Sequence, residues 1–192
     1  MNSRKKERVM VALSGGVDSS VAAALLVDEG HEVEGVYVKT WEHERDVLGD
    51  CPGAQDLADA QEVAECLGIP FEVVNFVDFY QENVVRPMVE GYRNGITPNP
   101  DVTCNRRMKF GKLLEHAEER GFEALATGHY CRRELAEDGA PQLWEGLDKN
   151  KDQSYFLARI LPKQLAGARF PLGEIPKPEG RRIAKERKIP VA

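Results

Sequence analysis

Residues 14–20, Ser-Gly-Gly-Val-Asp-Ser-Ser, have the composition of a phosphate-binding loop. Two glycines allow a tight turn and a close approach of the backbone to a ligand, and a helix after them presents free N–H groups and its positive dipole end to an anion. The serine hydroxyls add donors for phosphate oxygens. The pattern is neither GxxxxGK[ST] nor GxGxxG, so a Walker A loop and a dinucleotide fingerprint fit poorly. The alternative is a strand-to-helix turn with a serine cap.

Cys104 is the candidate nucleophile. It lies in the stretch 95–105, whose two prolines, glycine and two asparagines predict a structured loop. The basic residues Arg106, Arg107 and Lys109 come directly after it. Nearby positive charge favours the thiolate, which is the reactive form of cysteine. The alternative is a buried structural cysteine.

The elements that must position these residues alternate between strands and helices. Short β-branched runs predict strands at 8–13, 33–39, 71–75 and 124–127, and apolar residues at helical spacing predict helices at 17–29, 56–67, 79–93 and 107–120. Regular alternation predicts an α/β fold with a doubly wound parallel sheet and helices on both faces. In such sheets ligands bind beyond the carboxyl ends of the strands, where residues 14–20 lie.

The second half of the chain is less regular. Pro87 is expected to kink or split the helix over 79–93, because proline lacks an N–H donor. Residues 142–145 are expected to form an edge strand, and a helix is expected near 178–188. We therefore expect one domain over 1–150, and after it a basic, mainly helical segment over 151–192 that begins the RNA-contacting region.

Composition excludes several classes of protein. The 192 residues are 42% apolar and have a net charge of −6, too apolar for a disordered chain and without the run of about 18 apolar residues that a membrane span needs. The apolar stretch near the N-terminus is too short for a signal peptide, so a soluble, cytoplasmic protein is expected. The charge is uneven, −12 over 1–150 and +6 over 151–192. This asymmetry favours a polyanionic partner, with an ordinary solvated face as the alternative.

The four cysteines show no CxxC spacing and no close pairing with histidine, which favours free thiols over disulfides or a zinc site. Cys66 lies among apolar residues of a predicted helix and is expected in the core. An iron–sulfur cluster held by Cys51, Cys104 and another thiol such as Cys131 stays open as an alternative.

Further motifs lie between the phosphate loop and the end of the chain. They are Thr-Pro-Asn-Pro-Asp-Val-Thr-Cys-Asn at 97–105, Lys-Phe-Gly at 109–111, Ala-Thr-Gly-His-Tyr at 126–130 and Gly-Leu-Asp-Lys-Asn-Lys-Asp-Gln-Ser-Tyr-Phe at 146–156. With these motifs, the chain from about Val9 to Ala192 resembles the tRNA-uridine 2-sulfurtransferase (2-thiouridylase) family. The resemblance implies the adenine nucleotide alpha-hydrolase-like fold of PP-loop ATP pyrophosphatases. It also implies a reaction in which ATP adenylates the C2 oxygen of the wobble uridine of a tRNA and sulfur then replaces that oxygen.

The resemblance assigns roles to particular residues. ATP phosphates are expected at Ala12, Leu13, Ser14, Gly15, Gly16, Val17, Asp18 and Ser19, the adenine or ribose at Val38, and the nucleotide against Gly128. The target base is expected at Asn99, Pro100 and Asp101, with Asp101 also a candidate for proton transfer and Cys104 as the nucleophile. Contacts with tRNA are expected at His129, Lys151, Asp152 and Gln153. For His129 the alternatives are the α-phosphate or a locally satisfied ring, and for Lys151 an ordinary surface charge.

The resemblance further implies a persulfide donor protein and a Mg²⁺ ion on the ATP phosphates, with no protein ligand assigned to the metal. Asp18 is a candidate ligand, and helix capping is its alternative role.

The family's second cysteine, a persulfide carrier in a Ser-Thr-Gly-Ile-Cys motif, is not found in this sequence, nor are the family's later tRNA-binding and β-barrel domains. We therefore expect a catalytic fragment rather than a naturally short relative. Three interpretations stay open: a 2-thiouridylase or its ATP-binding part, a nucleotide- and RNA-binding module without complete chemistry, and an amide-forming ATP pyrophosphatase. The third leaves the basic segment and the cysteine loop unexplained.

Overall fold

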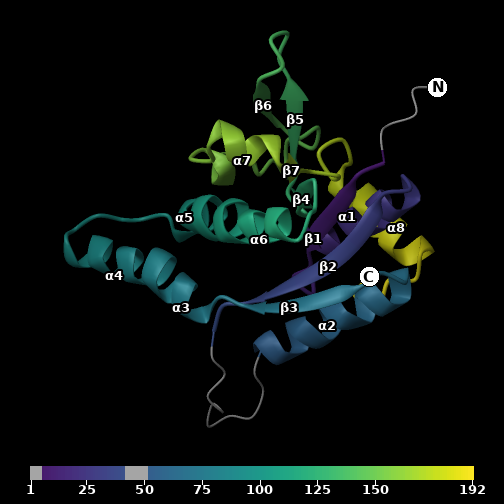
Figure 1. Ribbon diagram of the computed structural model, residues 1–192, viewed down its shortest axis with the longest axis horizontal. Coiled ribbons are helices and arrows are strands. Elements are labelled where there is room, and N and C mark those ends of the chain that lie inside the picture. The colour runs from purple at the N-terminus through teal and green to yellow at the C-terminus, as the bar shows by residue number, and fades with distance from the viewer. Residues whose placement is uncertain (1–5, 42–51) are drawn as a thin grey trace.

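The computed structural model describes residues 6–41 and 52–192 of the protein (Figure 1). Its centre is a parallel sheet in the order β3-β2-β1-β4-β7. The strands are β1 (Arg8–Ala12), β2 (Glu32–Lys39), β3 (Phe71–Asn75), β4 (Ala124–Ala126) and β7 (Ala168–Arg169). The chain winds outward from β1 to β3 and then returns to place β4 on the other side of β1. The order therefore reverses between β1 and β4, where a doubly wound sheet opens a crevice at the carboxyl ends of its strands.

Helices cover both faces of the sheet, as predicted. Helices α1 (Val17–Asp28), α2 (Pro52–Leu67) and α8 (Lys177–Glu186) pack on the face to which Val9 and Val11 of β1 point. Met10 points to the opposite face, where it joins residues of helix α6 (Leu114–Glu119), of the helical segment before it and of α7 (Pro162–Ala166). Strand side chains alternate between faces, so a run of apolar residues such as β1 is buried on both sides.

The helix expected over 79–93 begins at Val77 and runs as α3 (Val77–Tyr80), a π-helical segment η1 (Gln81–Val85) and α4 (Arg86–Arg93). The expected interruption by Pro87 takes the form of this π-helical turn. A proline ring clashes with the carbonyl four residues earlier, and the wider π turn directly before Pro87 gives that carbonyl room.

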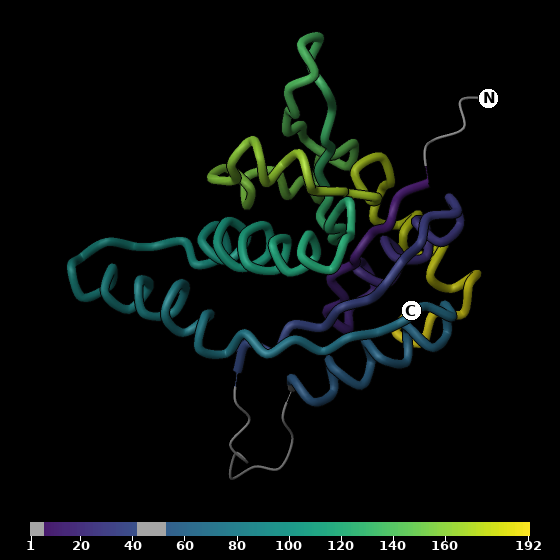
Figure 2. Tube along the Cα trace, viewed as in Figure 1, coloured from purple at the N-terminus to yellow at the C-terminus, as the bar shows by residue number. Residues whose placement is uncertain are grey.

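The loop predicted over 95–105 is wrong from Pro100 onward. Residues Pro100–Cys104 form helix α5, which continues as the π-helical segment η2 (Asn105–Leu113) into α6. The Asn99 side chain caps α5 by accepting a hydrogen bond from the backbone N–H of Val102 at 3.1 Å. Proline at the first helical position and asparagine as the cap are typical of a helix start, so these residues begin a helix rather than a loop. The two helical stretches run side by side as an arm of the molecule (Figure 2).

A separate antiparallel hairpin consists of β5 (Cys131–Leu135) and β6 (Pro141–Glu145), with Arg133 opposite Leu143. The strand expected at 142–145 is therefore present, in the hairpin and not in the main sheet. A 3-10 turn, η3 (Ser154–Leu157), comes after the hairpin. Residues 151–192 then supply β7 to the main sheet and α8 to the cluster around α1. The boundary expected at residue 150 stays a prediction. No helix in the described ranges is long and apolar enough to span a bilayer.

Candidate functional site

The predicted phosphate loop joins the end of β1 to the start of α1. Gly15 has φ +76°, a conformation that favours glycine, and Gly16 is the extended residue before the helix. The first helical hydrogen bond joins the N–H of Ser20 to the carbonyl of Gly16 at 3.3 Å. The three preceding N–H groups of α1 therefore have no acceptor within the helix, and no side chain among the described residues caps Gly16. These N–H groups and the positive end of the α1 dipole face the carboxyl edge of the sheet, where they can bind an anion.

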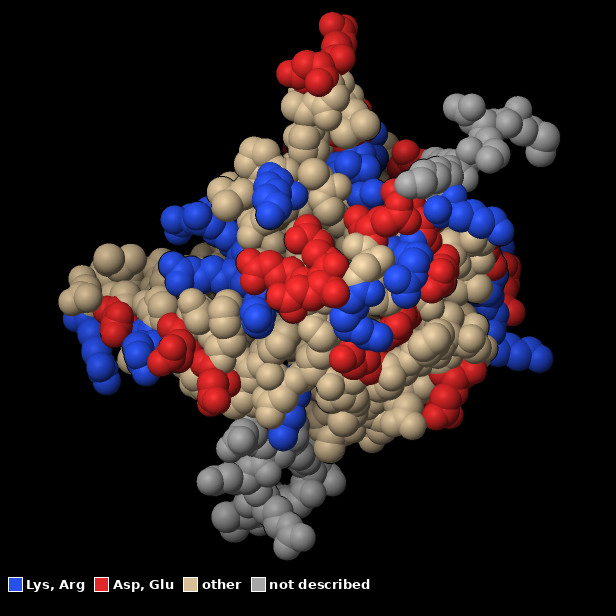
Figure 3. Space-filling view, in the orientation of Figure 1, with Lys and Arg blue, Asp and Glu red and all other residues tan. Residues whose placement is uncertain are grey.

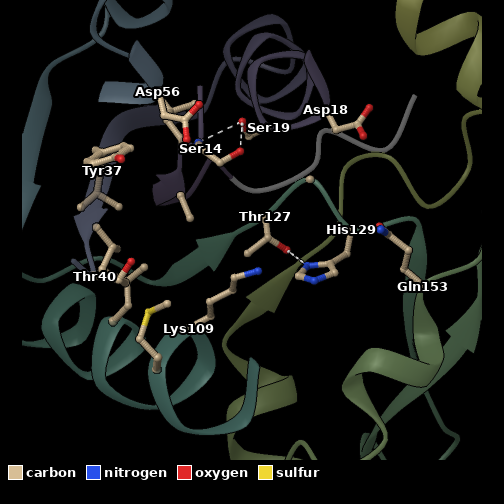
Figure 4. Close-up of a pocket in the computed structure, with 17 residues that line it drawn as sticks. Ser14, Asp18, Ser19, Tyr37, Thr40, Asp56, Lys109, Thr127, His129 and Gln153 are labelled. Atoms are coloured by element: carbon tan, nitrogen blue, oxygen red, sulfur yellow. Dashed lines mark hydrogen bonds between the residues drawn. The ribbon is translucent and has the colours of Figure 1, made fainter. Parts of the chain in front are cut away.

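Serine side chains hold this loop in shape. The hydroxyl of Ser19 accepts a hydrogen bond from the N–H of Ser14 at 3.2 Å and donates to the carbonyl of Gly16 at 3.0 Å. The hydroxyls of Ser14 and Ser19 lie 3.2 Å apart (Figure 4). The loop is therefore closed by its own side chains.

Gly128 packs the segment after β4 against the same helix start. A Cβ at this position would lie 2.8 Å from the backbone nitrogen of Ser19 and 2.8 Å from the carbonyl carbon of Asp18. Such contacts are closer than a side chain tolerates, so only glycine lets the two backbones meet here. The loops after β1 and β4 thus line one crevice at the point where the strand order reverses.

This crevice opens into a cavity of about 380 Å³, within the range of small-molecule sites. Among the residues predicted for the nucleotide, those that line the cavity are Ala12, Leu13, Ser14, Asp18, Ser19, Val38 and Gly128. Gly15, Gly16 and Val17 form the adjoining turn and are not among its lining residues. His129 and Gln153, which were predicted to contact tRNA, also line it.

Sequence reasoning missed several other residues of the cavity wall. They are Val36, Tyr37, Thr40, Asp56, Met108, Lys109, Leu113 and Thr127. Tyr37 and Thr40 lie on either side of the predicted Val38, at the carboxyl end of β2. They could have been predicted, because ligands of doubly wound sheets bind beyond the carboxyl ends of the strands. Asp56, from α2, lies against the loop, since a Cβ on Gly15 would be 2.6 Å from its carbonyl oxygen. The packing of Asp56 against the loop could not be predicted from the neighbouring sequence, because it joins residues far apart in the chain.

Asp18 pairs with the other end of the chain. Its carboxylate accepts hydrogen bonds from the ammonium of Lys177 and, at 3.0 Å, from the hydroxyl of Tyr130. Burial and the Asp18 charge raise the pKa of the Tyr130 phenol, which stays protonated. The first turn of α8 is thereby tied to the first turn of α1.

His129 is 7% exposed, and its Nδ1 lies 2.7 Å from the hydroxyl of Thr127. Burial, and secondarily the charge of Lys109, lowers the pKa of His129 to about 3. The ring is therefore neutral near pH 7 and acts through hydrogen bonding rather than charge.

Cys104 ends helix α5 and is half-buried, while Asp101 in the first turn is exposed. Burial raises the pKa of the Cys104 thiol, Lys109 lowers it and Asp101 raises it, with burial the largest effect and the net change upward. The charge of Lys109 favours the thiolate, as the sequence predicted, but burial outweighs it. Burial and the charges of Cys104 and Asp101 raise the pKa of Tyr80, which places this phenol beside them. Asn99, Pro100, Asp101 and Cys104 are not among the cavity's lining residues.

The segment 151–153 begins beside the hairpin. Asp152 accepts hydrogen bonds from the N–H of Gly146 at 2.9 Å and the hydroxyl of Ser154 at 2.7 Å. Gln153 accepts one from the N–H of Tyr130 at 3.1 Å. Both side chains therefore brace the turn between the hairpin and the 3-10 turn, whereas Lys151 is exposed. Their contacts with tRNA stay predictions.

Part of the basic charge of residues 151–192 is paired within the protein. Four of its ten basic residues form ion pairs with described residues: Arg169 with Glu7, Lys177 with Asp18, Arg182 with Glu179 and Glu186, and Arg187 with Asp28. On the face in Figure 3, acidic and basic side chains are interspersed. The charge counted from sequence therefore overstates what this segment offers to a polyanion.

The described cysteines are free thiols. Cys66 is exposed, so its predicted core position is wrong; the buried side of α2 consists of Ala60, Val63 and Ala64, and Cys66 lies outside that stripe. Cys131 is buried, and burial raises its pKa. Cys51 lies outside the described residues. Within the described ranges, no group of three or more His, Cys, Asp or Glu residues is arranged to hold a metal ion.

Comparison with known proteins adds to this geometry. Residues 7–192 match the family described as the tRNA methyl transferase HUP domain. The chain is 54% identical to the tRNA-specific 2-thiouridylase MnmA of Akkermansia muciniphila, over 96% of this chain and 52% of that protein. It is 50% identical to the MnmA of Psychromonas ingrahamii, over 98% of this chain and 51% of that protein. The chain thus spans about half the length of the curated relatives it matches.

Solved structures share the fold at low identity. The NMN synthetase of Francisella tularensis superimposes with a TM-score of 0.55 at 18% identity, over 96% of this chain and 63% of that one. A glutamine-dependent NAD⁺ synthetase of Acinetobacter baumannii, solved with ADP, gives 0.57 at 17% identity, over 96% of this chain and 29% of that one. The predicted α/β fold of the adenine nucleotide alpha-hydrolase type is confirmed. The chain belongs to the tRNA methyl transferase HUP domain family and is similar to about half of the length of MnmA-type tRNA 2-thiouridylases.

Proposed function

We propose that this chain binds ATP and adenylates the C2 oxygen of the wobble uridine of a tRNA, as the activating part of a 2-thiouridylase in the cytoplasm. The observation that carries the proposal is the convergence of the serine-rich loop and Gly128 on one cavity, in a chain of this family. The α-phosphate would lie at the helix start after residues 14–16, with the adenosine toward Val38 on β2.

The chemistry requires activation because a urea-type carbonyl is a poor electrophile. The C2 oxygen attacks the α-phosphorus, a C2–O–P bond forms, and pyrophosphate leaves. The outer sulfur of a persulfide donor protein then attacks C2, a C2–S bond forms, and AMP leaves with the former carbonyl oxygen. The thiolate of Cys104 attacks the donor's inner sulfur, which breaks the S–S bond, leaves the outer sulfur on C2 as the thiocarbonyl and joins Cys104 to the donor as a disulfide. Asn99, Pro100 and Asp101 at the start of the helix that carries Cys104 meet the base.

Mg²⁺ belongs to the proposal as the counter-ion of the ATP phosphates, where it would neutralise developing charge. Asp18 and Asp56 are the acidic residues that line the cavity, and one or two carboxylates with phosphate oxygens form an ordinary Mg²⁺ ligand set. Asp18 is already paired with Lys177, which leaves Asp56 as the better candidate.

The test is incubation of the chain with ATP, Mg²⁺, a persulfide donor and unmodified tRNA, and then mass analysis of the wobble nucleoside. Thiolated or adenylated uridine supports the proposal. Adenylation without thiolation favours a nucleotide- and RNA-binding part that lacks the complete chemistry. Release of pyrophosphate with a small carboxylate, and none with tRNA, would exclude the tRNA assignment. A Cys104→Ser variant should bind ATP normally and fail to thiolate.

A further inference from the structure

One basic side chain of the stretch after Cys104 reaches the nucleotide cavity. Arg107 is exposed and donates to the side chain of Asn83 at 3.1 Å, in the neighbouring helical stretch of the arm. Lys109 instead lines the cavity. Figure 4 shows its ammonium pointing toward Thr127, across the cavity from the serine hydroxyls of the phosphate loop.

Lys109 has no counter-ion among the described residues. Within 6–41 and 52–192, no ion pair joins it to a carboxylate, whereas the other lysine near the loop, Lys177, is paired with Asp18. Charged groups that lie in a cavity are ordinarily paired, because removal from water is unfavourable for them. An ammonium that faces a helix N-terminus across a cavity in this way indicates an anionic ligand between the two.

The π-helical register brings Lys109 to the face that carries Cys104. The two residues are five positions apart, and η2 begins directly after Cys104. In an α-helix such residues point in different directions, but in a π-helix the i→i+5 pairing places them one turn apart on the same side. The charge of Lys109 accordingly acts on two groups, lowering the pKa of Cys104 and that of His129 in the cavity wall. π-Helical turns are frequent at functional sites.

We propose that Lys109 is a catalytic residue with two contacts: its ammonium binds a phosphate oxygen of the nucleotide, and it stabilises the thiolate of Cys104 one helical turn away. The inference rests on the proposed function, which supplies the nucleotide and the role of the thiol. It also couples the two steps. While ATP is bound, its phosphates interact with the Lys109 ammonium, which then stabilises the Cys104 thiolate less. The thiol is therefore less ionised until pyrophosphate has left.

The test compares Lys109→Met and Lys109→Arg with Lys112→Met in the full 192-residue chain. Lys112 lies on the same π-helical segment and is not among the lining residues of the cavity, so its variant controls for loss of charge on that helix. Calorimetry measures binding of ATP and of adenosine. Iodoacetamide labelling, measured peptide by peptide in a mass spectrometer, gives the rate of Cys104 alkylation against pH, with and without ATP.

Lys109→Met should weaken ATP binding about ten- to a hundredfold and leave adenosine binding unchanged, because a charge-assisted hydrogen bond to phosphate is lost. Its Cys104 alkylation profile should shift to higher pH, with the rate at pH 8 about three- to tenfold lower. ATP should slow alkylation in the wild type and have no further effect in this variant. Lys109→Arg should recover both properties, and Lys112→Met should behave as wild type.

Unchanged ATP affinity in Lys109→Met would overturn the phosphate contact, and an unchanged alkylation profile would overturn the contact with the thiol. Failure of Lys109→Arg to recover either property, with a lowered melting temperature in both Lys109 variants, would show a structural role instead. A wild-type chain that binds ATP but never modifies tRNA would refute the proposed function, while these two readouts would still decide the role of Lys109.

Discussion

Replacing Gly15 by alanine should damage the phosphate loop more than the same replacement at Gly68. Both glycines have positive φ, +76° and +66°, so alanine is strained by about 1–2 kcal/mol at either position. A Cβ on Gly15 would also lie 2.6 Å from the carbonyl oxygen and 2.8 Å from the Cα of Asp56 in α2. A Cβ on Gly68 would meet no heavy atom of the described residues within 4 Å apart from its own chain neighbours. Forcing a methyl group into packed backbone adds about 1–3 kcal/mol.

We therefore expect Gly15→Ala to lower the free energy of unfolding by about 2–5 kcal/mol and Gly68→Ala by about 1–2 kcal/mol. Urea denaturation of both variants, with slopes compared to the wild type, measures the difference. Gly15→Ala should also weaken ATP binding by more than about tenfold, because the N–H groups at the helix start move with the loop. Equal destabilisation by the two substitutions would refute the packing of α2 against the loop, and intact ATP binding in Gly15→Ala would refute the site.

Three further predictions concern the cavity wall and helix α5. Because His129 has a pKa of about 3 when folded and about 6.5 when unfolded, its contribution to stability is complete above pH 6.5 and is lost as the pH falls toward 3. Between pH 7.5 and 5.5 the free energy of unfolding, measured by urea denaturation, should fall by about 1.4 kcal/mol more in the wild type than in His129→Gln. An equal fall in the two proteins would contradict this prediction. At pH 8, iodoacetamide should label exposed Cys66 before half-buried Cys104, and buried Cys131 last, as peptide mapping can show; a reversed order would contradict the burial. Asn99→Ala should destabilise the protein by about 1 kcal/mol through loss of the cap and speed alkylation of Cys104, whereas an unchanged rate would argue against the cap.

The phosphate loop and the four predicted strands arise from short-range rules. Glycine, serine and β-branched residues act on the backbone within a few positions, so β1 and the turn after it could be placed from composition. Gly128 was assigned through family resemblance, and its physical reason appears only in three dimensions, where its backbone meets Ser19.

The start of helix α5 is not decided by its own residues. Asn99 and Pro100 are typical of turns and equally typical of a helix start, and the distinction depends on whether the residues after them continue the helix. The net effect on the ionisation of Cys104 could not be predicted from sequence for a different reason. Neighbouring charges are visible in sequence, but the burial that outweighs them comes from tertiary packing.

Long-range pairing accounts for the remaining gaps. Strand β7 has two residues and no periodic pattern, and it exists because it pairs with β4, far earlier in the chain. Strand β5 carries arginines and depends on its partner β6. Lys109 was grouped with the basic residues around Cys104, and only the π-helical register singles it out.

The central claim is that the cavity brings the C2 oxygen of a tRNA uridine to the α-phosphorus of ATP. It is tested most directly with tRNA that carries ¹⁸O at C2 of the wobble uridine, incubated with the chain, ATP, Mg²⁺ and a persulfide donor. Adenylation of that oxygen predicts that the released AMP carries ¹⁸O, detected by mass spectrometry. AMP that carries only ¹⁶O, alongside thiolated uridine, would show that the oxygen leaves by another route and would contradict the account.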